Sequence, residues 1–272
     1  MQKKIEKLLF QILVKDMQKS LSRQLLKSVI SLLFIQFLRI SPAYAACADP
    51  PAPAVNWAKC TIEDKDFKNK DLSNAVLTGA IIVNSDFSGA NLENADLNFT
   101  EITNSRFDHA RMANTRMVSI TMLDSSMKKT IFHDSHISRS EIKGSDLTGM
   151  RARNANFYQV KIDSSSLQGA TLSDSNFENS RLTAVNLSGS NMDKAVLLGS
   201  RISDSRFENA NLTRAVFDES YCIGVDFSAA DLTKASFREA ELEEITLEGA
   251  ILKDTTWTDY RRCRANSVGE CR

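Results

Sequence analysis

Apolar residues recur at every fifth position from Ile62 to Trp257. Of the 40 positions in this series, 37 are Leu, Ile, Met or Phe, and the register continues without insertion or deletion. A second series, two residues earlier, holds Ala, Ser, Thr, Val or Cys at 35 of its 40 positions. A period of five fits neither a helix at 3.6 nor a strand at 2.0. The chain is therefore expected to turn once per repeat, with one large and one small residue inward.

Individual repeats show the unit plainly, as in ANLEN at 90–94 and ANLTR at 210–214. They resemble the pentapeptide-repeat family, whose motif is A-(D/N)-L-x-x. The resemblance covers residues 62–257 of the 272. It implies an all-β fold, a right-handed quadrilateral β-helix with four repeats per coil and one repeat per face.

Sorting the large apolar residues with a period of 20 supports four repeats per coil. The column that starts at Ile62 holds six of the seven isoleucines in the series and no phenylalanine. The column that starts at Phe67 holds five of the ten phenylalanines. Like side chains thus stack from coil to coil. Forty repeats make about ten coils, a rod about 48 Å long at a strand spacing of about 4.8 Å.

Residues 1–45 resemble an export signal, which is cleaved from the mature protein. A basic region precedes the apolar run at 29–38, and AYA at 43–45 is typical of a signal-peptidase site. We expect cleavage after Ala45 and a periplasmic protein without stable membrane insertion. Met17 would start a signal of ordinary length. Two alternatives stay open, namely an uncleaved membrane anchor and a lipoprotein lipidated at Cys47.

The rest of the chain divides into three parts. Residues 46–61 form a Pro/Ala-rich cap, residues 62–257 the β-helix, and residues 258–272 a C-terminal cap. The only two tryptophans, Trp57 and Trp257, mark the two ends of the repeats. They are interpreted as plugs over the terminal coils, because a solenoid needs its ends covered.

Four of the five cysteines lie at the ends of the rod. Four cysteines allow three pairings. Two of these would join opposite ends, whereas a disulfide needs Cα atoms about 4.4–6.8 Å apart. The surviving pairing joins Cys47 to Cys60 and Cys263 to Cys271. The fifth cysteine, Cys222, is expected to be a buried free thiol.

Charge is unevenly distributed along the rod. The whole chain has formal net charge zero, but residues 1–45 carry eight basic and two acidic residues, so the mature body is mildly acidic. This argues against nucleic acid as a partner. Residues 101–160 form a basic waist, and Arg106, Arg111 and Arg116 occupy equivalent outward sites on three successive faces. They are a candidate interaction surface, although a merely solvated face explains them as well.

Catalysis and metal binding find little support in the sequence. His133 and His136 lack a third nearby ligand. The coil of Met112, Met117 and two further methionines is interpreted as adaptable packing rather than a soft-metal site. A closed apolar core also leaves no cleft of the kind that enzymes use. We therefore expect no enzyme activity, no cofactor and no metal.

Three functions remain in view. The first is a non-enzymatic exported scaffold of the cell envelope that binds an unidentified protein partner; its oligomeric state is unknown. The second comes from the resemblance, because some cytoplasmic family members mimic DNA and inhibit DNA gyrase. Their surfaces are strongly acidic, whereas this chain has a basic waist. The third is an enzyme or metal binder.

Overall fold

The computed structural model describes residues 47–272, and the predicted signal and its cleavage site lie outside the described residues. The described residues contain no helix of the length and hydropathy that a membrane crossing requires. They contain ten strands of three residues each. The strands are β1 (Thr61–Glu63), β2 (Ile81–Val83), β3 (Glu101–Thr103), β4 (Thr121–Leu123), β5 (Glu141–Lys143), β6 (Lys161–Asp163), β7 (Arg181–Thr183), β8 (Arg201–Ser203), β9 (Tyr221–Ile223) and β10 (Glu241–Glu243).

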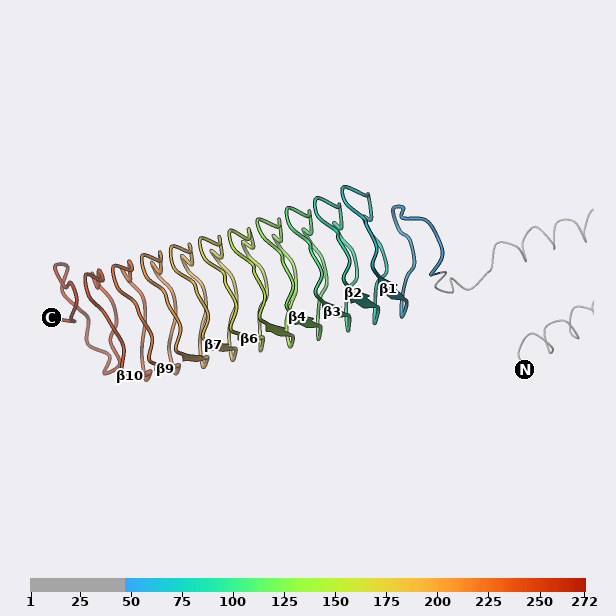
Figure 1. Ribbon diagram of the computed structural model, residues 1–272. Coiled ribbons are helices and arrows are strands. Elements are labelled where there is room, and N and C mark those ends of the chain that lie inside the picture. Colours follow the sequence, from blue (N-terminus) through green and yellow to red (C-terminus); the bar gives the residue numbers. More distant parts are fainter. Residues whose placement is uncertain (1–46) are drawn as a thin grey trace, which may run out of the picture. The chain divides into compact units, whose positions relative to one another are not determined.

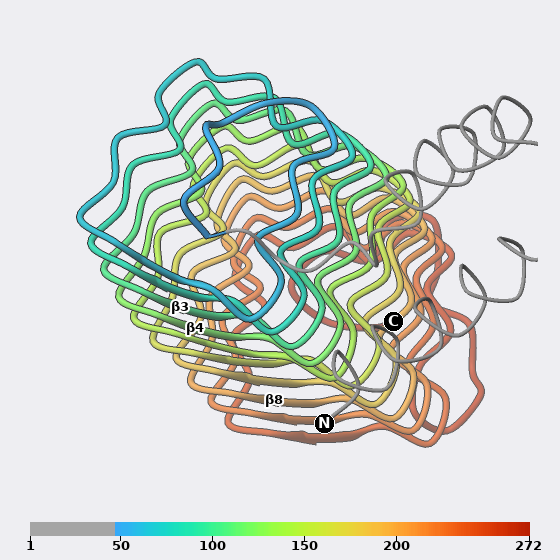
Figure 2. The same cartoon turned by 90° about the vertical axis from the view of Figure 1, so that its right-hand side faces the viewer.

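The strands form one parallel sheet in sequence order, and each strand from β1 to β9 pairs with the strand 20 residues later. Three further ladders of single parallel bridges run along the rod at the same offset. They start at the pairs Asp66↔Asp86, Asp71↔Asn91 and Asn56↔Val76. We number the strand ladder face 1 and the bridge ladders faces 2, 3 and 4. The coils lie side by side along the rod, and the view along the axis shows each coil stacked on the next (Figures 1 and 2). The predicted quadrilateral β-helix is confirmed.

The turn between faces explains the polar part of the repeat. One residue in each corner has a positive φ, such as Asn94 at 59° and Gly79 at 66°. Asn and Gly tolerate this left-handed conformation best. The Asp or Asn before the central residue supports the turn from the outside. For example, the carboxylate of Asp86 accepts the N–H of Ser88 at 2.9 Å. This local contact favours a turn every five residues.

The core consists of side chains stacked on their own kind. The rings of Phe87 and Phe107 are parallel, with centroids 4.8 Å apart, and those of Phe217 and Phe237 stack at 4.7 Å. Such offset pairs contribute about 0.5–1.5 kcal/mol beyond the burial of their area. The columns recognised in the sequence are therefore physical stacks, and each coil is stabilised mainly by its two neighbours.

Serine at the small inward position also has a function that its size does not reveal. The backbone N–H of Ser85 donates to the hydroxyl of Ser105 at 3.1 Å, and the N–H of Ser105 donates to Ser125 at 3.1 Å. The same contact continues from Ser125 to Ser145 at 3.2 Å. A buried N–H without a partner costs about 1–3 kcal/mol. This serine ladder therefore satisfies backbone groups that alanine would leave unpaired.

The stacked core predicts that alanine substitution at two phenylalanines, Phe87 and Phe99, changes the free energy of unfolding by very different amounts. Phe87 is fully buried between Phe67 and Phe107, whereas Phe99 is 62% exposed at an outward corner. Phe87→Ala should lower the free energy of unfolding by about 3–5 kcal/mol, and Phe99→Ala by less than about 0.5 kcal/mol. Urea unfolding of both variants checks this. Equal losses would contradict the assigned orientation of the repeat.

Candidate interaction surface and terminal caps

The N-terminal end is closed by a disulfide and a tryptophan. Cys47 and Cys60 form a disulfide with Cα atoms 5.5 Å apart. The indole of Trp57 is 3% exposed and stacks on Phe67 with ring centroids 4.9 Å apart. The backbone N–H of Trp57 also donates to the carbonyl of Val76 at 2.8 Å. The cap thus already follows the 20-residue register and covers the first complete coil.

The C-terminal end is closed differently. Cys263 and Cys271 form the second disulfide, with Cα atoms 4.9 Å apart. The tail folds back and pairs antiparallel with the last coil, through the bridges Ile251↔Val268 and Thr256↔Arg262. Trp257 lies 5.6 Å from Phe237 between ring centroids but is only partly buried. It therefore covers its end less completely than Trp57 does.

Cys222 is the only free cysteine among the described residues, and it is buried. Its side chain lies within 3.6 Å of the Ser220 hydroxyl. Burial raises the pKa of the Cys222 thiol to about 11. Since the thiolate is the reactive form, this cysteine is inert at neutral pH.

The three arginines of the predicted belt lie on faces 2, 3 and 4, and each is near a carboxylate. Arg111 donates to Glu93 at 2.7 Å, and Arg116 donates to Asp96 at 2.7 Å, both reaching back by one coil. Arg106 lies 3.9 Å from Asp108 within its own repeat. The belt exists as a sequence pattern, but its charges are compensated locally and point in three directions.

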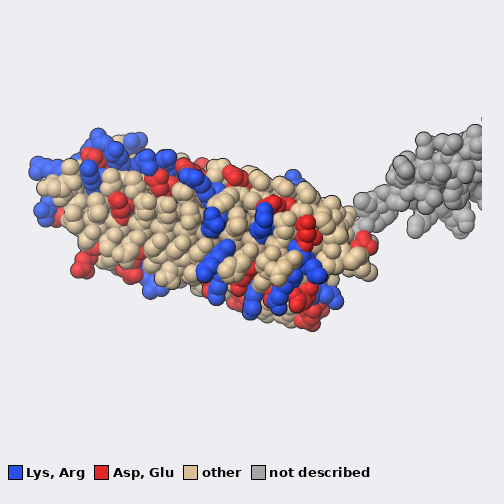
Figure 3. Space-filling model, turned by 90° about the horizontal axis from the view of Figure 1, so that it is seen from above, with Lys and Arg blue, Asp and Glu red and all other residues tan. Residues whose placement is uncertain are grey.

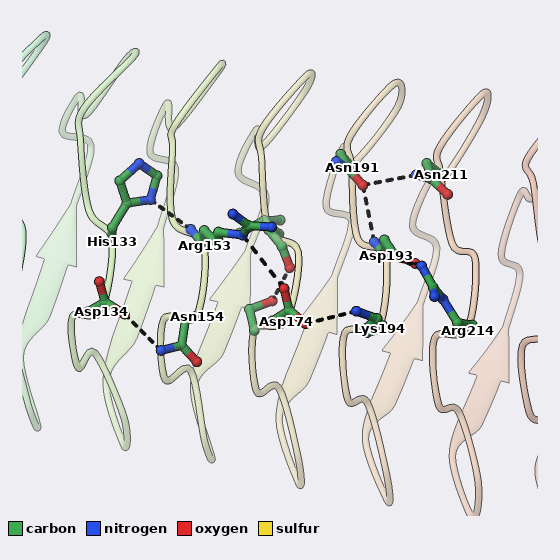
Figure 4. Close-up of polar contacts among 12 residues, drawn as sticks. His133, Asp134, Arg153, Asn154, Asp174, Asn191, Asp193, Lys194, Asn211 and Arg214 are labelled. Carbon is green, nitrogen blue, oxygen red and sulfur yellow. Dashed lines mark hydrogen bonds and ion pairs between the residues drawn. The ribbon is translucent and has the colours of Figure 1, made fainter.

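Three of the six other basic residues of the waist are compensated in the same way. Lys128 contacts Asp146 at 2.9 Å, and this hydrogen bond raises the pKa of Lys128. Arg153 and Lys194 both approach Asp174, at 3.7 and 3.8 Å, in a ladder that crosses three coils (Figure 4). One side of the rod accordingly carries basic and acidic side chains close together (Figure 3). Exposed pairs of this kind contribute about 0–1 kcal/mol each.

Three basic residues on face 1 are different, and we call them the cationic stripe: Lys161, Arg181 and Arg201. They are the first residues of β6, β7 and β8 and are direct register partners of one another. All three side chains are exposed, and none makes an ion pair with another described residue. Like charges directly opposite each other destabilise a sheet. The stripe therefore costs stability, and packing does not explain it.

The surroundings of the stripe make it a surface for binding rather than for catalysis. With Arg139 and Gln159, the stripe lines a shallow open depression of about 560 Å³. At one end the guanidinium of Arg201 lies over the ring of Tyr221, 5.5 Å from its centroid. Glu141 and Glu241 occupy the same column beyond the two ends. The result is three uncompensated cations on a flat face, about 4.8 Å apart from strand to strand.

The histidines are not brought together as a metal site. The Nδ1 atom of His133 accepts the N–H of Arg153 at 3.1 Å, and burial and the nearby Arg151 lower its pKa. No cluster of three metal-ligating side chains of the His, Cys, Asp or Glu type occurs in residues 47–272. Met112 and Met117 are fully buried in the core.

Sequence comparison agrees with this architecture. A model of the pentapeptide repeat region matches residues 170–247, and a model of pentapeptide repeats in eight copies matches residues 71–108 and 140–179. The chain belongs to the pentapeptide-repeat family. No curated protein matches it.

Solved structures of pentapeptide-repeat proteins are also similar. QnrB1, a plasmid-mediated fluoroquinolone resistance protein, is 21% identical over 68% of this chain and 88% of its own, with a TM-score of 0.45. HetL, involved in heterocyst differentiation regulation in the cyanobacterium Nostoc sp. PCC 7120, is 22% identical over 74% of this chain and 92% of its own, with a TM-score of 0.26. Those roles belong to the proteins named.

Proposed function

We propose that this protein is an exported, non-enzymatic scaffold of the cell envelope that presents the cationic stripe to an acidic protein partner. The observation that carries the proposal is the pair of disulfides, one at each end of the rod. Disulfides form and persist in oxidising compartments and are rare in the cytosol. They agree with the export signal that the sequence of residues 1–45 predicts.

The position of the disulfides supports a structural role in such a compartment. Each closes a short loop, of 13 and 8 residues, over an end of the solenoid. A disulfide stabilises by restricting the unfolded chain, and here the restriction acts where the stack has a neighbour on one side only. The remaining thiol, Cys222, is buried and does not compete for pairing.

The stripe supports a partner of opposite charge. Its cations form no ion pairs with described residues. A carboxylate-bearing surface would therefore gain charge-assisted hydrogen bonds without breaking existing ones. The rod itself is rigid in the sense that every coil is bonded to the next on four faces. A flat, pre-organised row of cations favours an extended acidic segment over a small molecule.

The same features weigh against the other candidates. A DNA-mimicking gyrase inhibitor needs rows of carboxylates, whereas the longest unpaired row of like charge on the strand face is cationic. An enzyme needs a cleft with convergent polar groups, whereas the interior of this rod is filled by stacked apolar side chains.

Export predicts a specific intact mass for the protein isolated from its native host. The chain should begin at Ala46, and reduction should add four hydrogens, two for each disulfide. Intact-mass spectrometry of the envelope fraction, before and after reduction, checks both points. A chain that retains residues 1–45 would refute cleavage, and one that also has free thiols throughout would refute export.

The stripe predicts which arginines a partner needs. Arg181→Gln with Arg201→Gln should weaken partner binding about tenfold or more, since a hydrogen bond to a charged group contributes about 1.5–3 kcal/mol. Arg111→Gln with Arg116→Gln removes the same charge from compensated positions and is the matched control. Crosslinking in the envelope, followed by quantification of copurified proteins, measures the effect. Equal losses in the two double variants would show that only net charge matters.

A further inference from the structure

The last coil, residues 241–260, is paired with the tail on only two of its four faces. On faces 3 and 4 the tail supplies the missing neighbour. The N–H of Leu252 donates to the carbonyl of Ser267 at 3.0 Å, and the N–H of Cys263 donates to Thr255 at 2.9 Å. The tail thus shows that the end of this rod accepts an extended strand in antiparallel orientation.

Faces 1 and 2 of the same coil have no such backbone pairing with the tail or with any other described residue that follows the coil. In the preceding coil, the N–H groups of Gly224, Phe227 and Ala229 donate to carbonyls 19 residues later, at 3.0, 2.8 and 2.7 Å. The equivalent N–H groups of Glu244, Leu247 and Gly249 have no following coil, and they donate to no backbone carbonyl of the described chain. We call residues 241–249 the open edge. Unpaired edges of this kind are templates for a further strand.

The core beneath the open edge is incompletely covered. Leu242, Ile245 and Leu247 are only partly buried. In the preceding coil the residues of the same columns are at most 1% exposed; they are Cys222, Val225 and Phe227. A strand laid along the edge would therefore cover apolar surface as well as satisfy backbone groups, and the two gains act together.

The rim of the open edge has a single sign of charge. Glu241, Glu243, Glu244 and Glu248 are exposed, none is in an ion pair with a described residue, and residues 241–249 include no Lys or Arg. Two open edges facing each other would bring eight carboxylates together, so a second copy of this chain is disfavoured. A strand that carries Lys or Arg is favoured.

We propose that the open edge binds an extended, basic peptide segment of a partner protein, which adds to β10 and face 2 as an antiparallel strand. The backbone N–H groups of Glu244, Leu247 and Gly249 donate to carbonyl groups of the added strand. The glutamates select Lys or Arg on the outward side, and small apolar residues on the inward side cover Leu242 and Leu247. This site differs from the cationic stripe in position, in charge and in the partner that it selects.

Binding of a synthetic peptide with alternating Lys and Val tests the proposal on the intact disulfide-bonded protein. Fluorescence anisotropy should detect saturable binding, and hydrogen exchange should show slower exchange of the Glu244, Leu247 and Gly249 amides. A depsipeptide of the same sequence, in which esters replace the backbone amides, keeps the charge but has carbonyl groups that accept hydrogen bonds less strongly. It should bind at least about tenfold more weakly, the loss expected for hydrogen bonds worth about 1.4 kcal/mol in total.

Charge selection is tested with two matched double variants. Glu243→Gln with Glu248→Gln should weaken binding of the unmodified peptide about tenfold. Glu101→Gln with Glu141→Gln removes the same charge from exposed positions of β3 and β5 and should leave binding unchanged. Equal binding of the depsipeptide, equal effects of the two double variants, or protection outside residues 241–249 would overturn the proposal. Protection of these amides by self-association without peptide would assign the edge to a second copy and overturn it too.

Discussion

Stacking of each coil on the next at a fixed offset of 20 residues is the constraint on which the rest of this structure depends. It brings Ile62 under Ile82 and Phe87 under Phe107, and it lines up the serine ladder. Every parallel backbone ladder uses the same offset. Because the parallel backbone ladders join each coil to its neighbours, stability grows by repetition rather than around one centre.

The ends follow from the same constraint, because a stack must stop somewhere. At the N-terminus, Trp57 occupies the position of a core residue, and the Cys47–Cys60 disulfide closes the loop that contains it. At the C-terminus, the tail leaves the register and reverses direction, so it covers two faces and leaves two open. Both the disulfide-bonded caps and the open edge thus arise because the last layer of a solenoid has no next coil to pair with. The two proposed binding surfaces follow from these features: the register aligns the cationic stripe, and the incomplete cap leaves the open edge.

The sequence predicts the fold and the disulfide pairing because both depend on periodicity and on the length of the rod. The site was harder to predict. The ion pair of Arg111 with Glu93 joins residues 18 positions apart in the sequence. Counting charges within a segment of the chain does not reveal such a pair. Lys161, Arg181 and Arg201 are 20 residues apart, so the period that aligns the core residues also places them in one outward column. The open edge had no such signal, since the path of residues 258–272 is not periodic.

The most direct test of the 20-residue register compares two deletions of nearly equal size. Removal of residues 141–160 takes out one whole coil and places Ser165 where Ser145 was, so the columns and the serine ladder continue. Removal of residues 141–162 takes out two residues more, and every later inward side chain loses its position. Urea unfolding should show a cooperative transition close to that of the parent protein for the first variant and loss of the folded rod beyond β4 for the second. Similar unfolding midpoints for the two variants would contradict the account.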